Sequence, residues 1–473
     1  MAPTFFWYDL ETTGLDSLMD RPLQFAGVRT DTELNPIESP VNIFCLPGDD
    51  VLPSPEAIMV TGLSMSRLRS LGSNEIEFCR RIMSSFSVPE TCVVGYNSLN
   101  FDDEFVRQMC YRNFYDPYAR EWRNGNSRWD VINMFRMAYA LRPGGLEWPK
   151  NDAGAVTFRL EELTKANGIE HHDAHDAVSD VLATIALTKL LRESQPRLFN
   201  FLFALRKKDR VATILNLSDK KPIIHVSPVY GTQRSYFGII LPLCRHPRNP
   251  NGFICCDLSF NPTELINSTE TELNQILFSS VENWKNVNSY NPLVTIYTNR
   301  CPAIAPLTSV NTEDTMRLDI SLSQCLDHMR QIQKSYGLSD KIKTVFSERT
   351  FREENDPDKM LYQGNFFGAR DRDLMNQIHR LRPDQLLEME GQFEDERLNE
   401  MLFRFRARNY PHILTVEEEV RWNRYRIDRW NGGRSIEDLL EKSKKIQEKS
   451  GKPESPHLID LVNYINQISE GVL

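Results

Sequence analysis

The sequence lacks several features that would assign it to particular classes of protein. It has no apolar run of membrane-spanning length and no charged, then apolar, leader after Met1, so we expect neither a membrane span nor a secretory signal. Its nine cysteines are scattered, and Cys255 and Cys256 are adjacent instead of forming a C-x-x-C pair. This pattern argues against a disulfide framework and a zinc site, and it predicts reduced thiols in a cytoplasmic protein.

The length and the charge of the chain set further limits. At 473 residues the chain exceeds what one hydrophobic core usually organises, so two or three domains are expected. The formal net charge of −9 argues against a protein that coats nucleic acid through bulk positive charge. A nucleic-acid enzyme is still compatible with this charge, because the field that binds a strand is local. No feature demands an oligomer, so a monomer is expected.

Three regions follow one another along the chain. Residues 1–195 alternate short apolar strands with helices, which is typical of an α/β domain. In residues 196–348, β-like runs between proline, asparagine and glycine turns predict a small, mostly antiparallel domain, followed by helical spacing. Residues 349–473 begin with a charged linker and continue as a helical domain rich in arginine, glutamate and leucine.

The strand at the start of the first region ends in two carboxylates. Residues 4–8 are apolar and aromatic enough for a buried strand, and Asp9 and Glu11 follow them closely. Residues two apart on a strand point the same way, so the two carboxylates share one face, where they repel each other and are costly to desolvate. A divalent cation would remove that repulsion. Taken alone, the pair is better explained by a turn cap at Asp9 and a solvated Glu11.

Three more residues of the first region have the chemistry to complete a metal site. Asp102 lies near a helix start, and His175 and Asp180 lie at the start of the helix predicted over 174–192. Strand ends and helix starts are where α/β folds usually place their sites. Oxygen ligands suit Mg²⁺ or Mn²⁺, and two such ions about 4 Å apart suit an in-line phosphoryl displacement. His175 has the pKa range of a general base that takes a proton from the attacking water.

Each of these residues also has an ordinary structural explanation. Asp102 could be the N-cap of an acidic first turn, and Asp180 a solvated helix residue. His175 could belong to a chance group with His171 and His172. Five such coincidences in this order are improbable together, so the residues point to metal-assisted phosphodiester hydrolysis.

Several motifs carry a resemblance to a known family. The runs FWYDLETTGL (6–15), VVGYNSLNFDDEF (93–105) and HDAHDAVSD (172–180) resemble the motifs of the DEDD superfamily of 3′→5′ exonucleases, in the DEDDh branch whose third motif carries histidine. Further segments resemble the bacterial exodeoxyribonuclease I family over nearly the whole chain, among them RNFYDPYAREW (112–122), FRLEELTKANGIEH (158–171), LYQGNFF (361–367) and MLFRFRARNYP (401–411).

The resemblance implies a fold and an activity. The fold is an RNase H-like exonuclease domain (1–195), an SH3-like β-barrel domain with inserted helices (196–348) and a C-terminal helical domain (349–473), which together form a C-shaped groove. The activity is Mg²⁺-dependent, processive 3′→5′ hydrolysis of single-stranded DNA to 5′-mononucleotides in DNA repair or recombination.

The resemblance also implies roles for individual residues. Those that match the family's ligands for two Mg²⁺ ions are Asp9, Glu11, Asp102 and Asp180. His175 matches the general base. Glu11, Thr12 and Arg159 match residues that lie against the substrate, and an arginine there suits phosphate because its guanidinium binds two oxygens at once.

A stretch rich in arginine and aromatic residues supports a single-strand channel independently of the family. Over residues 105–142 these two types interleave. Guanidinium groups neutralise phosphates, and aromatic rings stack on bases without sequence preference. We expect about half of these side chains to be structural, because aromatics dominate protein cores. Those expected to contact DNA are Arg107, Tyr118, Trp122, Arg136 and Arg142.

Other functions are compatible with the same residues. A polymerase proofreading subunit or an RNA-processing exonuclease would use the same chemistry, but the two additional domains disfavour both. A non-catalytic nucleic-acid-binding scaffold would keep the fold without turnover, which the intact set of five residues disfavours. The family further implies docking of the acidic C-terminal tail of single-stranded DNA-binding protein, for which no residues are assigned here.

Overall fold

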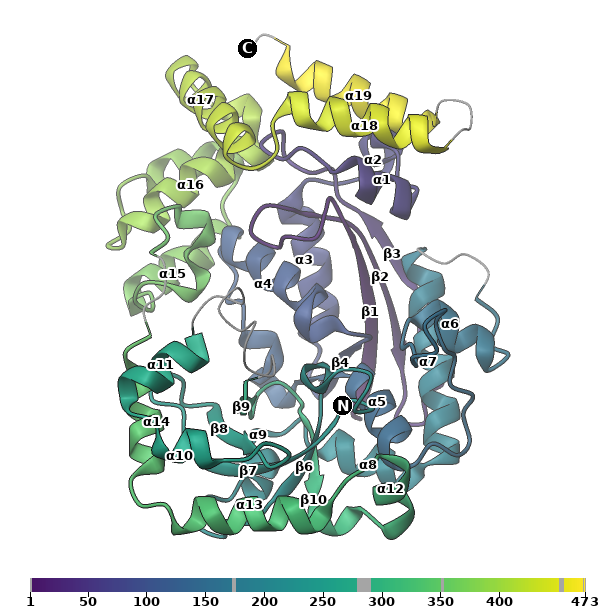
Figure 1. The fold of residues 1–473 in the computed structure, drawn as a ribbon. Helices are drawn as coiled ribbons and strands as arrows, with labels where there is room; N and C mark the ends of the chain where they lie inside the picture. Colours follow the sequence, from purple (N-terminus) through teal and green to yellow (C-terminus); the bar gives the residue numbers. More distant parts are fainter. Residues whose placement is uncertain are drawn as a thin grey trace. The chain divides into compact units, whose positions relative to one another are not determined.

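The computed structural model describes residues 2–171, 176–278, 291–349, 353–450, 455–470 and 472. These residues form two compact units, each assembled from separate stretches of the chain (Figure 1). Unit 1 comprises Met1–Arg128, His171–Ile185 and Glu353–Leu473, and unit 2 comprises Trp129–Glu170 and Ala186–Arg352. Unit 1 includes the C-terminal helices because they share a hydrophobic core with Leu23 and Phe44 of the first sheet.

The first sheet is built around the opening strand. β1 (Thr4–Thr12) lies at its centre, in the order β3-β2-β1-β4-β5. It pairs antiparallel with β2 (Pro22–Thr30) and parallel with β4 (Thr91–Gly95). The edges are β3 (Val41–Phe44) and β5 (Ser127–Asp130). The strands predicted at 4–8, 22–31, 41–47 and 92–94 are confirmed, with shifted ends.

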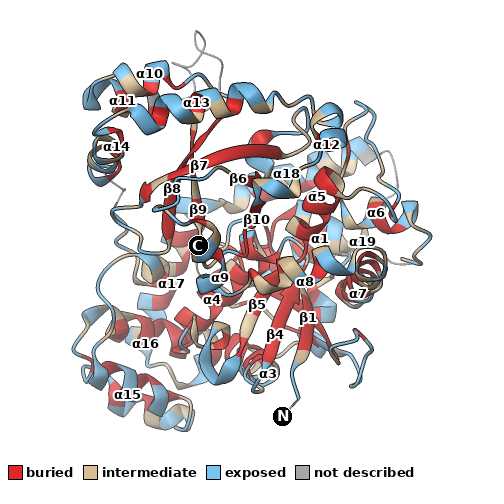
Figure 2. Ribbon diagram, turned by 90° about the horizontal axis from the view of Figure 1, so that it is seen from below, coloured by how far each residue is buried: buried red, intermediate tan, exposed pale blue. Residues whose placement is uncertain are grey.

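Two helices cover one face of this sheet. α3 (Glu75–Phe86) and α4 (Asp102–Arg112) bury apolar side chains against Phe6, Tyr8 and Leu10 of β1. Each such side chain stabilises the fold by about 1.5–3 kcal/mol when fully buried. These three residues alternate along β1 with Asp9 and Glu11, so the two carboxylates point to the other face. Figure 2 shows the strands β1 and β4 in the buried class.

The C-terminal helices complete the cores of unit 1. They are α15 (Ala369–Ile378), α16 (Glu396–Asn409), α17 (Val416–Gly433), α18 (Ile436–Ser450) and α19 (Pro456–Ser469). One apolar cluster joins α15 and α16 to Tyr111 and Phe114, and another joins α17, α18 and α19 to Leu23 and Phe44. The second cluster includes residues of α1 (Pro55–Thr61) and α2 (Met65–Leu71). The expected helical character of this region is therefore confirmed, and its cores are shared with the first region.

Unit 2 contains an antiparallel sheet in the order β10-β6-β7-β8-β9. Its strands are β6 (Ile223–Val226), β7 (Phe237–Arg245), β8 (Gly252–Asp257), β9 (Leu293–Tyr297) and β10 (Ala303–Pro306). The small, mostly antiparallel domain expected here is confirmed. Among the residues that the structure describes, the two edge strands do not pair to close a barrel.

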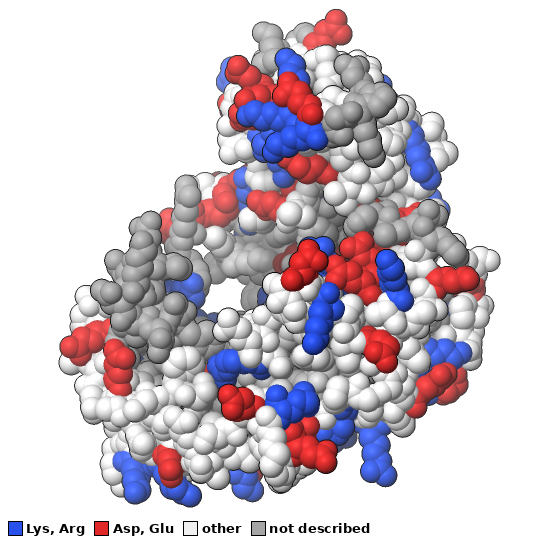
Figure 3. Space-filling view, turned by 45° about the vertical axis from the view of Figure 1, so that its right-hand side comes forward, with Lys and Arg blue, Asp and Glu red and all other residues white. Residues whose placement is uncertain are grey.

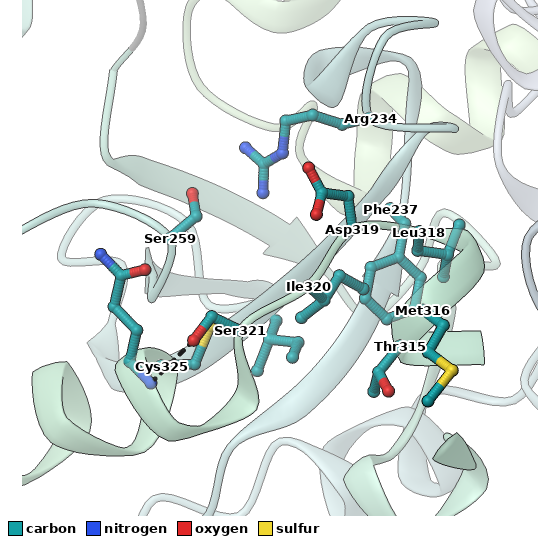
Figure 4. A pocket seen from close by; sticks show the side chains of 12 residues that line it. Arg234, Phe237, Ser259, Thr315, Met316, Leu318, Asp319, Ile320, Ser321 and Cys325 are labelled. Carbon is teal, nitrogen blue, oxygen red and sulfur yellow. Dashed lines mark hydrogen bonds between the residues drawn. The ribbon is translucent and has the colours of Figure 1, made fainter. Parts of the chain in front are cut away.

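Unit 2 also contains helices. They are α5 (Ile132–Leu141), α6 (Leu160–Ala166), α8 (Pro196–Ala204), α9 (Lys208–Ile214), α10 (Thr263–Asn267), α11 (Glu270–Phe278), α12 (Thr312–Arg317), α13 (Leu322–Lys334) and α14 (Leu338–Ser347). Of these, α5, α9 and α14 contact the second sheet. α7 (Ala177–Ser194) contributes residues to both units. Unit 2 contains a cavity of about 580 Å³. Figure 4 shows side chains that line it, among them Arg234, Asp319 and Cys325. Arg234 is bound there to the buried Asp257 at 2.7 Å.

The distribution of charged side chains and the free state of the cysteines agree with the sequence analysis. On the face drawn in Figure 3, acidic and basic side chains are interspersed. All nine cysteines are buried and free. Among the described helices, none combines the length and the apolar composition that crossing a bilayer requires.

Candidate active site

Two carboxylates point from one face of β1. Asp9 lies opposite Ala26 and Glu11 lies opposite Gln24 in the antiparallel pairing with β2. Glu11 is only 9% exposed, and Asp9 is half-buried. The strand alternation thus brings the two side chains to the same side, as the sequence predicts.

A third carboxylate reaches this pair from helix α7. Asp180 lies in the first turn of α7, more than 160 residues along the chain from β1. One oxygen each of Asp9, Glu11 and Asp180 lie within 4.8 Å of one another. This spacing lets one cation contact all three side chains. An all-oxygen set fits a hard divalent cation such as Mg²⁺ or Mn²⁺.

The electrostatics of the cluster favour a bound cation. Burial, and then the charges of Asp102, Asp180 and Asp176, raise the pKa of Asp9 well above its usual value. Burial, with Asp9, Asp180 and Asp176, raises the pKa of Glu11 to about 9. Without added positive charge the cluster therefore retains protons at neutral pH. A divalent cation would offset the repulsion and lower both pKa values.

Asp102 lies beside the cluster at the start of α4. Its Oδ1 accepts a hydrogen bond from the backbone N–H of Leu10 at 3.1 Å, which ties it to β1 next to Asp9. It is outside the group of three within 4.8 Å, but after burial its charge is the largest contribution to the raised pKa of Asp9. Asp102 is thus placed to act as a ligand of a second cation beside the first.

Asp103, the next residue, has the opposite environment. Tyr8 donates a hydrogen bond to Asp103 at 2.7 Å, and the guanidinium groups of Arg120 and Arg128 bind its two oxygens. Burial alone would raise the pKa of Asp103, but Arg120 and Arg128 hold it well below its usual range. These two arginines of the 105–142 stretch therefore have a structural role.

Two further residues at the start of α7 belong to the site and were missed in the sequence. His171 Nε2 lies 2.5 Å from Asp180 Oδ1, although the sequence alone suggested a chance histidine. Asp176 accepts hydrogen bonds from Ser179 N at 3.2 Å and from Gln24 Nε2 at 3.5 Å. The spacing of Asp176 and Asp180 was the available signal, because residues four apart lie on one helix face. His175 lies outside the described residues, so its role as general base stays a prediction.

The expected DNA contacts within unit 1 have mixed surroundings. Thr12 is buried beside Glu11. Arg107 is buried and bound to Glu121 at 2.8 Å, and its guanidinium lies over the ring of Tyr118. Trp122 is 63% exposed. Among these residues Trp122 is open to stack on a base, whereas Arg107 is held by carboxylates, and their roles in binding DNA stay predictions.

Three expected contacts lie in unit 2. Arg136 is half-buried and donates to Asn133 at 2.9 Å. Arg142 donates to the carbonyl of Ser309 at 3.0 Å. Arg159 is 74% exposed, with Glu162 at 3.7 Å. Arg159 is thus the most open of the three, and a contact with DNA stays a prediction for each.

A cavity of about 560 Å³ opens beside the carboxylate cluster within unit 1. Glu11 and Thr12 line it from β1, and Phe101 lines it from the segment before α4. Arg434 and Lys442 line it from the C-terminal helical region. Its volume is in the range of pockets that bind small ligands. No local pattern in the sequence linked the C-terminal helices to this site.

Family models match the chain in three stretches. The model described as "Exonuclease" matches residues 6–188, "Exonuclease I SH3-like domain" matches residues 206–348, and "Exonuclease I C-terminal domain" matches residues 355–468. The predicted domain boundaries themselves stay predictions.

Individual relatives extend this likeness over the length of the chain. Exodeoxyribonuclease I of Escherichia coli K12 is 41% identical over 424 residues, covering 89% of both chains. The structure of an exonuclease I from Methylocaldum szegediense matches with a TM-score of 0.93 at 44% identity, and E. coli exonuclease I with a dA16 oligonucleotide matches with 0.94 at 38%. A structure described as an ExoI/SSB-Ct complex matches with 0.91 at 36%. Each of these three covers all of both chains.

Proposed function

The chain belongs to the exodeoxyribonuclease I family and is an exonuclease of single-stranded DNA; on this premise we propose that it works from the 3′ end and releases 5′-mononucleotides. The observation that supports this proposal most directly is the cluster of Asp9, Glu11 and Asp180 beside a ligand-sized cavity. Polarity and product are carried over from the family resemblance. The chain would act processively as a cytoplasmic monomer in DNA repair or recombination.

The carboxylate cluster would hold the metal. Asp9, Glu11 and Asp180 would bind one Mg²⁺, for which Mn²⁺ could substitute, and Asp102 would contribute to a second site. When bound, such ions supply positive charge for the attacking and leaving oxygens of the phosphodiester. The raised pKa values of Asp9 and Glu11 support this assignment, because burial and the neighbouring carboxylates oppose ionisation of both groups and a bound cation would favour it.

Two histidines would have distinct roles near the scissile phosphodiester. His175 would accept a proton from the attacking water as general base. His171, 2.5 Å from Asp180, would fix the orientation of that carboxylate. The relative solved as an ExoI/SSB-Ct complex supports a further proposal, that this chain also binds the acidic C-terminal tail of single-stranded DNA-binding protein.

The test follows the release of mononucleotides from single-stranded DNA labelled at its 3′ or its 5′ end. Reactions contain Mg²⁺, Mn²⁺ or EDTA, with wild type beside Asp180→Ala and His175→Ala. Early release of the 3′ label, abolished by EDTA and by either substitution, is the expected result. Early release of the 5′ label would overturn the polarity, and binding without release under any divalent metal would overturn the proposed chemistry.

A further inference from the structure

The wall of the active-site cavity opposite β1 carries two cations from the C-terminal region. Arg434 follows α17, and Lys442 lies in the second turn of α18. Both line the cavity that Glu11 and Thr12 line from the other side. The two cations differ in whether a carboxylate already binds them.

Arg434 already binds a carboxylate of the chain. Its guanidinium binds both carboxylate oxygens of Asp20, at 2.6 and 2.8 Å, and Asp20 is fully buried. Asp20 also accepts hydrogen bonds from Thr13 Oγ1 at 2.9 Å and from Asp16 N at 3.0 Å. Arg434 therefore fixes the loop that follows β1 and is not free to bind a ligand.

Lys442 is held in place by its helix but not by a carboxylate. Leu439 and Ser443, one turn before and one residue after it, are buried, which anchors this part of α18. The Lys442 side chain is exposed, and no ion pair of it is found among the residues that the structure describes. Glu56, another residue of the cavity wall, accepts a hydrogen bond from the Ser54 hydroxyl at 2.7 Å. Burial alone would raise the pKa of Glu56, but that bond, and then the charges of Lys442 and Arg434, lower it, so Lys442 has a carboxylate nearby without forming an ion pair with it.

We propose that Lys442 binds a nucleotide phosphate in this cavity and so helps to hold the 3′ end of the strand. The inference rests on the proposed function, because it assigns the ligand of the same cavity. Glu11 and Asp180 repel a phosphate, and Arg434 is already neutralised by Asp20, so the charge of Lys442 is the one that would attract the phosphate at this wall. A lysine ammonium suits this task, because it is a compact charge on a flexible stem.

The experiment compares Lys442→Met with Lys444→Met, a matched change of an exposed lysine on α18 that does not line the cavity. Affinity for an oligothymidylate is measured in EDTA at several salt concentrations, and KM and kcat are measured in Mg²⁺. Lys442→Met should raise Kd and KM about threefold to tenfold with kcat within twofold, and it should flatten the slope of log affinity against log salt by about 0.7. Lys442→Arg should restore most of the affinity.

A second arm identifies the source of the phosphate. Weaker inhibition of Lys442→Met by thymidine 5′-monophosphate would show that Lys442 binds the phosphate of the released nucleotide. A flatter salt slope with unchanged inhibition would show that Lys442 binds a phosphate of the strand. Equal KM, salt slope and inhibition in Lys442→Met, Lys444→Met and wild type would overturn the inference. Binding in EDTA needs no catalysis, so a wild type without nuclease activity would refute the proposed function and leave this test intact.

Discussion

Two groups of buried carboxylates in unit 1 differ in the charges that surround them. In the first, Asp50 has three guanidinium groups within 3.7 Å, those of Arg21, Arg408 and Arg429. Burial would raise the pKa of Asp50, but Arg408, Arg429 and Arg21 outweigh burial and lower it to about 2. Arg408 also binds Asp358, so the group is a network that joins α16 and α17 to the loop after β3.

In the second group, Asp9 and Glu11 are buried beside other carboxylates, and burial and these neighbours raise both pKa values. Burial acts to raise the pKa in both groups, so the sign of the neighbouring charges decides the direction of the shift. The carboxylates of the arginine network are neutralised by the chain, whereas those of the cluster on β1 would be neutralised by the proposed cation from solution. Substitutions in the two groups should therefore have opposite effects on activity and stability.

The largest effect is expected on activity from Glu11→Gln. Loss of a charged oxygen ligand should reduce kcat/KM at least 10³-fold, or about 4 kcal/mol, because the metal would lose a ligand close to the reacting phosphodiester. Initial rates on single-stranded DNA measure this, with Glu77→Gln of α3, a partly exposed glutamate, as control. The same Glu11→Gln protein without metal should unfold at a higher temperature than wild type at pH 8. An unfolding temperature below that of wild type would contradict the proposed difference between the two groups of carboxylates.

The next effect is expected on stability from Asp50→Asn. Removing this charge leaves Arg21, Arg408 and Arg429 without their shared partner, and breaking a buried ion pair typically reduces the free energy of unfolding by about 3–5 kcal/mol. Urea denaturation measures the change. The exposed pair of Asp340 and Lys343 offers a control, since Asp340→Asn should cost at most about 1 kcal/mol. Equal losses of unfolding free energy in Asp50→Asn and Asp340→Asn would show that the arginine network does not stabilise the fold.

Metal binding should stabilise wild type, and more so at alkaline pH. The folded-state pKa of Glu11, about 9, lies above the usual 4.5, so the metal-free fold loses stability as pH rises between these values. Mg²⁺ at a hundred times its Kd should add about 2.7 kcal/mol. Thermal unfolding with and without Mg²⁺ at pH 6 and pH 8.5 measures this. The shift should shrink in Asp180→Asn, and an unchanged shift would place the metal elsewhere.

The smallest effect is expected in acid and has the opposite sign. The folded-state pKa of Asp50, about 2, lies below the usual 3.8, so its stabilisation is present above pH 4 and is lost as pH falls towards 2. This shift corresponds to about 2 kcal/mol. Unfolding free energies of wild type and Asp50→Asn between pH 6 and pH 2.5 should converge as the pH falls. Curves of unfolding free energy against pH that stay parallel for wild type and Asp50→Asn would contradict the lowered pKa of Asp50.

Much of the fold could be predicted from the sequence, because the alternation and spacing of nearby residues determine where the strands and helices form. Alternation along β1 placed Asp9 and Glu11 on one face, and the motif spacing brought Asp180 to them. Whether these residues bind metal stays a prediction. About half of the arginines and aromatics of 105–142 were expected to be structural, and Arg120 and Arg128 are buried and bound to Asp103. Arg107 is also bound to a carboxylate, and its expected contact with DNA stays a prediction.

The pairings between distant residues could not be predicted. Arg434 and Asp20 are 414 residues apart, and Arg408 and Asp50 are 358 apart. No local periodicity indicates which buried arginine meets which carboxylate, because the pairing depends on how the helices pack on the sheet. The contribution of Arg434 and Lys442 to the cavity was missed for the same reason.

Unit 1 is assembled from both ends of the chain, and this affects when the protein can fold during translation. Leu23 and Phe44 are synthesised well before Trp430, Leu461 and Ile465, with which they share a core. A ribosome adds about 5–20 residues per second, so β1 leaves the exit tunnel tens of seconds before these partners exist. A nascent chain therefore has no complete active-site wall until Arg434 and Lys442 have been synthesised, and a nuclease that would attack single-stranded DNA is assembled only after that point.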